Sequence, residues 1–411
     1  MGVAMGWVPG EPRVTRRRGR EVLWWLRVRT RLAAVALAVA GIALPIAGPT
    51  TAAAAAPGTF TYVTDDVSNT VSVIDTATNT VAATIPVGTG PQTVAVNPAG
   101  TFAYVTNAGS NTVSVIDTST NTVTTTIPVS SSPAGVAINP SGTFVYATNF
   151  SANSVSVIDT STNTVAATIP VGINPAIVAV SPSGSRAYVA NNGSGDVSVI
   201  DTSTNTVTTT IPVQANPVGV AVNPSGTRAY VTNSGSNTVS VIDTSTNTVI
   251  TTIPAGVSPW IVAVNPSGTR AYVTNGGSGN LSVIDTSTNT VIATIPVGSS
   301  PWGVAVNPSG TLAYVANRVS NNVSVIDTLT NTVYATVAVG NGPRGVGVGA
   351  VPATATASCP AGSVISGGGA QLSGPPPSNF SSKPVGNSWQ VSLTNVSGQP
   401  ITATPYAVCA N

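Results

Sequence analysis

The side chains that could carry chemistry in this sequence are few, and they recur at a fixed spacing. No histidine occurs in the chain, and the two glutamates, Glu11 and Glu21, lie near the N-terminus. Without His, the Ser–His–Asp and Cys–His catalytic sites and the His-ligated metal centres are excluded. What remains is Asp, and seven aspartates follow one another every 42 residues: Asp75, Asp117, Asp159, Asp201, Asp243, Asp285 and Asp327.

Each recurring aspartate ends the segment Val-Ile-Asp and opens a polar segment such as Asp243-Thr-Ser-Thr-Asn247. Asp, Ser and Thr side chains in such segments bond to nearby backbone amides. We therefore predict seven structural turn caps, no catalytic group and no metal or other cofactor. Asp65 and Asp66 lie outside the series, and a calcium ion held with backbone carbonyls is the alternative to a pair of solvated carboxylates.

A second series, the residue that follows a recurring proline, varies from repeat to repeat. Its two tryptophans, Trp260 and Trp302, are one repeat apart, and Arg344 follows after one more. Neighbouring indoles with a guanidinium nearby are typical of surfaces that stack on sugar rings or bind peptides. We predict ligand binding by Trp260, Trp302, Arg344 and Gln92, and the alternative is that both indoles plug a central channel. The full series is Gln92, Ala134, Ala176, Val218, Trp260, Trp302 and Arg344.

The elements that must position these residues are short strands rich in Val, Ile, Tyr and Thr. Asn223-Pro-Ser-Gly226 suits a type I turn between the first two strands of one unit. Four antiparallel strands in each unit of about 40 residues are typical of a propeller blade, whereas helical repeats need a 3.6-residue period. In the unit that begins at Pro217, strands a, b, c and d are predicted at 220–222, 228–232, 238–242 and 248–253.

Seven such repeats predict an all-β, seven-bladed propeller over residues 57–350. The first unit begins with a strand b at 59–64, and the last strand a, at 345–349, has no unit of its own. Placing that strand in the first blade closes the ring and protects the strand edges at the seam. Because strands alternate in direction, the d–a and b–c loops share one face of the disc, and this is the face on which the repeats differ.

The motif Tyr104-Val-Thr-Asn107, repeated at Tyr230 and Tyr272, resembles the signature of YVTN-repeat propellers. That family includes YncE-like secreted propellers and surface-layer proteins, and the resemblance covers residues 58–350. It implies the propeller fold and little about activity. Haem-bearing relatives need Cys-x-x-Cys-His and lactonase-type relatives need His or Glu, which these repeats do not contain.

Both ends of the chain indicate export. Residues 1–56 combine eight arginines, an apolar run at 32–48 and small residues at 52–56, the pattern of a secretory signal peptide. An uncleaved membrane anchor is the alternative. After a linker at 351–358, residues 359–411 resemble a small β module of secreted actinobacterial proteins, and export favours a disulfide between Cys359 and Cys409.

The function expected from these observations is extracellular, cell-surface or secreted, and non-catalytic: binding of a cell-wall polymer or a protein partner by the variable face. Two alternatives remain, a purely structural surface spacer and a lactonase- or lyase-like enzyme that uses Asp and Arg only. Beyond the leader there are six basic and ten acidic residues, so nucleic-acid binding lacks its electrostatic basis. Membrane contact is expected only through an uncleaved leader.

Overall fold

The computed structural model describes residues 58–351, 353–358, 364–373, 379–385, 388–394 and 402–410. The predicted leader and Cys359 lie outside these residues, so cleavage and the disulfide remain predictions. The only helix within the described ranges is a single 3-10 turn, η1 (Phe150–Ala152). Accordingly, nothing helical in this part of the chain has the length and apolar character needed to cross a membrane.

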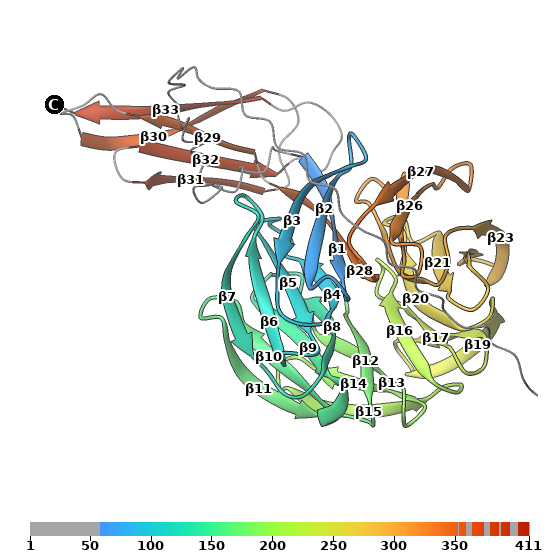
Figure 1. Ribbon diagram of the computed structural model, residues 1–411. Coiled ribbons are helices and arrows are strands. Elements are labelled where there is room, and N and C mark those ends of the chain that lie inside the picture. Colours follow the sequence, from blue (N-terminus) through green and yellow to red (C-terminus); the bar gives the residue numbers. More distant parts are fainter. Residues whose placement is uncertain are drawn as a thin grey trace, which may run out of the picture. The chain divides into compact units, whose positions relative to one another are not determined.

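Seven four-stranded antiparallel sheets form the blades of a propeller (Figure 1). Blade 1 is β28-β1-β2-β3, and blades 2 to 7 follow as β4–β7, β8–β11, β12–β15, β16–β19, β20–β23 and β24–β27. The a strands are β4 (Pro91–Val96), β8 (Pro133–Ile138), β12 (Pro175–Val180), β16 (Pro217–Val222), β20 (Pro259–Val264), β24 (Pro301–Val306) and β28 (Pro343–Val351). The b strands are β1 (Gly58–Asp65), β5 (Phe102–Asn107), β9 (Phe144–Asn149), β13 (Arg186–Asn191), β17 (Arg228–Asn233), β21 (Arg270–Asn275) and β25 (Leu312–Asn317).

The two outer strands of each blade complete the sheets. The c strands are β2 (Thr70–Asp75), β6 (Thr112–Asp117), β10 (Ser154–Asp159), β14 (Asp196–Asp201), β18 (Thr238–Asp243), β22 (Asn280–Asp285) and β26 (Asn322–Asp327). The d strands are β3 (Thr80–Pro86), β7 (Thr122–Pro128), β11 (Thr164–Pro170), β15 (Thr206–Pro212), β19 (Thr248–Pro254), β23 (Thr290–Pro296) and β27 (Thr332–Ala338). In the unit that begins at Pro217, strands b, c and d begin where the sequence predicts and each ends one residue later.

The ring closes as the sequence predicts. β28 pairs antiparallel with β1, with Thr61 opposite Val348, and completes the first blade (blue and orange in Figure 1). The a strands of successive blades pack against one another, and β28 contacts both β24 and β4. The a strands therefore form a continuous inner ring, and their first residues surround its centre.

Strand a begins three residues earlier than predicted, at the recurring proline. In blade 5 the register shifts between Pro217 and Val220, which leaves a bulge next to β17. The hydroxyl of Thr232 fills this gap, because it accepts from the amide of Gly219 at 2.8 Å and donates to the carbonyl of Trp260 in the next blade at 2.6 Å. A side chain of the Tyr-Val-Thr-Asn motif thus joins neighbouring blades.

Apolar residues of adjacent blades share each core cluster. Tyr230 and Val239 of blade 5, for example, pack with Val262 and Val273 of blade 6. The tyrosine of every repeat is buried, and the final asparagine of the motif secures the b–c loop: Asn233 Nδ2 donates to Thr238 Oγ1 at 3.1 Å and to Ser240 Oγ at 2.9 Å. The motif therefore stabilises the blades and their loops.

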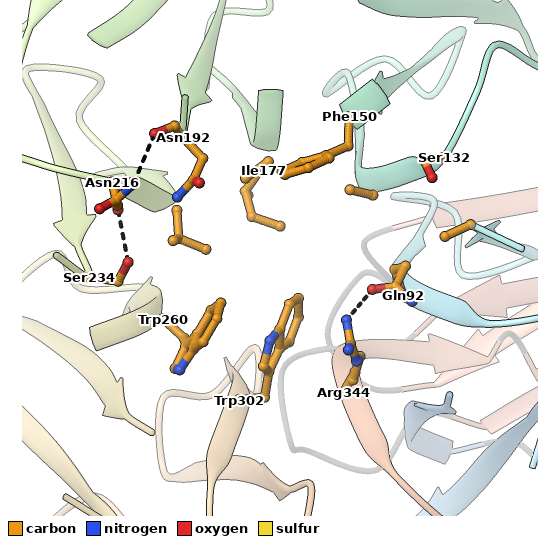
Figure 2. Close-up of a pocket in the computed structure, with 14 residues that line it drawn as sticks. Gln92, Ser132, Phe150, Ile177, Asn192, Asn216, Ser234, Trp260, Trp302 and Arg344 are labelled. Carbon is orange, nitrogen blue, oxygen red and sulfur yellow. Dashed lines mark hydrogen bonds between the residues drawn. The ribbon is translucent and has the colours of Figure 1, made fainter. Parts of the chain in front are cut away.

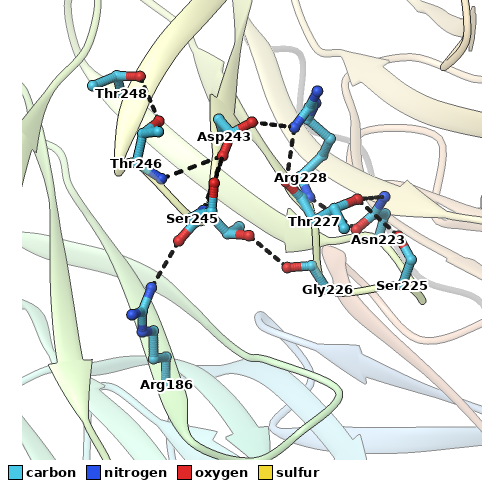
Figure 3. A network of polar contacts seen from close by, with 11 residues as sticks. Arg186, Asn223, Ser225, Gly226, Thr227, Arg228, Asp243, Ser245, Thr246 and Thr248 are labelled. Carbon is cyan, nitrogen blue, oxygen red and sulfur yellow. Dashed lines mark hydrogen bonds and ion pairs between the residues drawn. The ribbon is translucent and has the colours of Figure 1, made fainter.

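On the a–b and c–d turn face, each predicted cap aspartate accepts a hydrogen bond from the backbone amide two residues later. At Asp243 the hydroxyl and amide of Ser245 also hold the pKa of the carboxyl down to about 2. Arg228 Nη1 lies 2.5 Å from Asp243 Oδ2, and Arg186 of the previous blade donates to the Thr244 carbonyl at 2.7 Å (Figure 3). The caps thus also link blades.

Beyond the propeller, two small antiparallel sheets are described. One has the order β29-β32-β31 and the other pairs β30 with β33. Residues 353–358, predicted as linker, instead form β29, because alternating Ala and Thr suit a strand and pair with β32. The strands are β29 (Ala353–Ser358), β30 (Val364–Ser373), β31 (Asn379–Val385), β32 (Ser388–Thr394) and β33 (Thr402–Ala410).

Candidate binding site at the mouth of the propeller

The variable residues that follow the seven prolines converge on one cavity. Each is the second residue of an a strand, at the end of the inner ring that faces the d–a and b–c loops. The cavity has a volume of about 460 Å³, within the range of small-molecule sites. Its lining includes the whole series: Gln92, Ala134, Ala176, Val218, Trp260, Trp302 and Arg344. The four residues predicted to bind a ligand therefore share one wall or rim of a single site.

A second ring of residues surrounds the same mouth, and the sequence analysis did not predict it as part of the site. It consists of the first residue of each b–c loop, directly after the b strand. Every member is a different amino acid, which was the available signal. The ring is Asp66, Ala108, Phe150, Asn192, Ser234, Gly276 and Arg318, of which Ala108, Phe150, Asn192 and Ser234 line the cavity.

The two tryptophans stack on each other. Their ring centroids are 6.2 Å apart with an interplanar angle of 29°, and both side chains project into the cavity (Figure 2). Cζ of Arg344 lies 5.5 Å from the centroid of the Trp302 ring, a cation–π contact. Trp302 is therefore held between an indole and a guanidinium, and the predicted grouping of these three residues exists in the fold.

A glycine makes room for Trp260. A Cβ atom at Gly276 would lie 2.3 Å from Nε1 of Trp260, closer than any real contact. The first b–c residue of the other blades has a side chain. In blade 6 its absence allows the indole to occupy that space.

Beside Trp302 there is a polar corner, which consists of Asp66, Gln92, Arg318 and Arg344. Its Oδ2 lies 3.0 Å from Nε of Arg344 and 3.2 Å from Nη2 of Arg318. Gln92 donates from Nε2 to Asp66 Oδ1 at 3.3 Å and accepts from Nη1 of Arg344. Burial lowers the pKa of Arg344, and the charge of Asp66 opposes this effect. One carboxylate thus faces two guanidinium groups.

The adjacent Asp65 lies in a different environment. It is fully buried, accepts from Ser72 Oγ at 2.8 Å and from Thr70 Oγ1 at 3.0 Å, and its burial raises the pKa to about 6. Asp65 and Asp66 are therefore not the solvated pair considered from the sequence, because one is enclosed within its blade and the other is ion-paired. Their carboxylates have separate partners, and among the described residues no group of three acidic or thiol side chains could hold a metal ion.

Two apolar side chains line both the mouth and a second cavity. A smaller cavity of about 110 Å³ lies among the a strands and shares Ile177 and Trp302 with the mouth. These two side chains therefore lie where the two cavities meet and narrow the channel there. Trp260 lines the larger cavity and does not line the smaller one. That the two indoles together plug the channel stays a prediction.

Polar groups with unused capacity complete the lining. Asn192 Nδ2 donates to the Pro217 carbonyl at 3.2 Å, and Asn216 Nδ2 donates to the Asn192 carbonyl at 3.4 Å. Their amide oxygens accept no hydrogen bond from the residues that the structure describes, and the two indole N–H groups donate none there. The mouth thus offers free acceptors, free donors and aromatic surface together.

Comparisons with known proteins agree with this architecture. Residues 74–219 match the model of the seven-bladed lactonase β-propellers, and residues 221–311 match that of the YNCE-like β-propellers. No curated protein matches the chain. Among solved structures, a chain of Kuenenia stuttgartiensis hydrazine synthase is 25% identical with a TM-score of 0.61, covering 65% of this chain and 92% of that one.

A functionally unknown protein from Desulfotomaculum acetoxidans DSM 771 has a TM-score of 0.63 at 18% identity, covering 71% of this chain and 99% of its own, a likeness of fold alone. The closed ring of seven sheets and the two family matches lead to one conclusion. This chain is a seven-bladed β-propeller with repeats similar to those of YNCE-like and lactonase-type propellers.

Proposed function

We propose that the protein is an extracellular, non-catalytic propeller whose mouth binds a sugar residue of a cell-wall polymer. The observation that carries this proposal is the convergence of two variable positions of the repeat on one cavity with a stacked tryptophan pair. Indoles pack on the apolar faces of sugar rings, and amide and guanidinium groups bond to their hydroxyls. The turn face, by contrast, repeats the same caps seven times.

The charges at the mouth support binding over catalysis. Asp66 is the acidic group of this corner, and both of its oxygens already have partners in Arg318, Arg344 and Gln92. A general base needs a free oxygen within reach of a substrate proton. Asp65 has an elevated pKa, but it is enclosed in its blade and does not line the cavity.

A lactonase- or lyase-type activity is the second candidate, because residues 74–219 match the lactonase model. That match runs from the end of β2 in blade 1 to the start of β16 in blade 5 and ends before Trp260, Trp302 and Arg344. Hydrolysis of lactones by the purified protein, measured by acid release at constant pH, tests this candidate. If the wild type hydrolyses a lactone and the Asp66→Asn variant does not, the protein is an enzyme and the binding proposal is refuted.

The binding proposal is tested by replacing both indoles. We expect the exported protein to bind members of an array of cell-wall polymers and oligosaccharides, and the Trp260→Ala/Trp302→Ala variant to lose that signal. The matched control is Tyr334→Ala, an aromatic residue on outer strand β27 with 66% of its surface exposed, which leaves binding unchanged. Binding that survives in the double variant, or no binding to any glycan, contradicts the proposal.

A further inference from the structure

The mouth has an uncompensated positive charge. Arg318 and Arg344 both pair with the same oxygen of Asp66, and the side chains of Arg344 and Asp66 are only 23% and 17% exposed. A single carboxylate cannot neutralise two guanidinium groups, so about one unit of charge remains in a half-buried site, where charge–charge interactions are weakly screened. Arg318 also adds to the lowering of the Arg344 pKa, which a second anion would relieve.

This charge is not a general property of the surface. The other arginines of the propeller, Arg186, Arg228 and Arg270, begin b strands, and Arg186 and Arg228 bond to the cap segments of the turn face (Figure 3). All seven cap aspartates lie on that face as well. At the mouth, by contrast, two guanidinium groups face one carboxylate in a half-buried site, and their positive potential favours an anionic ligand.

The guanidinium of Arg344 has the geometry to bind a carboxylate. Its Nε is next to Asp66 and its Nη1 donates to Gln92, whereas Nη2 has no partner among the described residues. The Trp302 ring holds the group at the edge of the cavity (Figure 2). A planar guanidinium forms short, directional, charge-assisted bonds to carboxylates, which Lys or an amide would not reproduce.

We infer that the mouth selects a sugar ring that bears a carboxylate, such as a uronic acid residue of an acidic polymer. This inference rests on the proposed function and specifies its ligand. The carboxylate pairs with Arg344, which lines the cavity, while Arg318 adds its positive charge from the adjacent polar corner. The apolar face of the ring packs on the indoles, and its hydroxyls donate to the free amide oxygens of Asn192 and Asn216. Phe150 and Ile177 bound the site on the far side (Figure 2).

The decisive variant removes the competing carboxylate without changing its size. Asp66→Asn leaves both guanidinium groups without an acidic partner, so we expect the affinity for hexagalacturonate to rise about fivefold or more, the scale of one charge–charge contact near a surface. The affinity for its methyl ester, which has the same rings without charge, stays unchanged. A gain in affinity cannot arise from misfolding, which makes this variant informative whatever its stability.

Two further variants complete the experiment. Arg344→Ala weakens binding of hexagalacturonate about tenfold or more, the cost of one lost charge-assisted bond, and affects the ester far less. Asp196→Asn is the matched control, because its carboxylate also lies at a b–c loop but bonds to Asn191 and does not line the cavity. It leaves both affinities unchanged. Hyaluronan hexasaccharide and its methyl ester serve as a second probe pair, and cellohexaose as a neutral glycan.

The outcomes separate the two proposals. If cellohexaose or the esters bind as tightly as both acidic oligosaccharides, and Asp66→Asn changes nothing, charge selection is overturned while the glycan-binding function stands. If no probe binds, or if binding is insensitive to loss of both tryptophans, the proposed function fails together with the inference. Preference for the acid that increases in Asp66→Asn and falls in Arg344→Ala supports both.

Discussion

Asp65 occupies the position at which each of the other six repeats has an asparagine. In those repeats the amide donates to two side chains of the next strand, as Asn107 does to Thr112 at 3.2 Å and Ser114 at 2.9 Å. Asp65 has no such donor and can only accept from Thr70 and Ser72. We therefore predict that Asp65→Asn stabilises the protein at neutral pH.

The magnitude follows from the pKa of Asp65. Burial raises it from 3.8 to about 6, and each unit corresponds to about 1.4 kcal/mol, so ionising the buried group costs about 3 kcal/mol. Because the folded-state pKa is higher than that of the unfolded chain, folding favours the protonated form. The contribution of protonated Asp65 to the free energy of unfolding is thus fully present below pH 4. It is lost as the pH rises through 6, and the protein stays less stable above that pH.

The assay is urea-induced unfolding of both proteins from pH 4 to pH 8. The stability difference in favour of Asp65→Asn is expected to grow by about 3 kcal/mol between pH 4 and pH 7. Asp243→Asn is the control, because the pKa of Asp243 is about 2 and its carboxyl stays ionised over this range; this variant keeps the wild-type pH dependence. Parallel pH profiles for wild type and Asp65→Asn would refute the reasoning.

Two further predictions concern contacts at the inner ring. Thr232→Ala removes the hydroxyl between Gly219 and Trp260 and leaves two buried backbone groups unpaired, so urea titration is expected to show a loss of about 1–3 kcal/mol; a loss no larger than that of the exposed Thr246→Ala would be inconsistent with this bridge. Gly276→Ala places a Cβ atom 2.3 Å from Trp260 Nε1 and is expected to displace the indole. Altered tryptophan fluorescence and weaker glycan binding check this, with Gly58→Ala, where a Cβ meets nothing closer than 3.6 Å, as the unchanged control.

Several features of the site could be read from the sequence because they are local to the repeat. Trp260, Trp302 and Arg344 are equivalent residues of successive repeats, so a closed ring must bring them to the same rim. The second variable ring was equally accessible, since seven different residues follow the seven b strands. It lacks the pair of tryptophans that distinguishes the first series, although Phe150 and Asn192 form part of the cavity.

Other features depend on contacts between distant repeats. The pairing of Asp66 with Arg318 joins residues that are 252 positions apart, and it exists only because blade 7 meets blade 1. The burial of Asp65 and the narrowing of the channel by Ile177 and Trp302 likewise arise from packing between strands. No spacing in the sequence encodes which side chain of a loop reaches its neighbour.

By itself, the sequence determined the blades, their number, the turn caps and the strand that closes the ring. The blades and caps follow from alternation of apolar residues and from hydrogen bonds between residues a few positions apart, such as the amide of Ser245 to Asp243. The number of blades and the closing strand follow from the number of repeats and from the strand a that has no unit of its own. Only the tertiary structure decided the charge of the mouth, the stacking of its indoles and the buried state of Asp65. Those properties depend on distances across blade interfaces and on exclusion of water, which arise when all seven repeats close on one another.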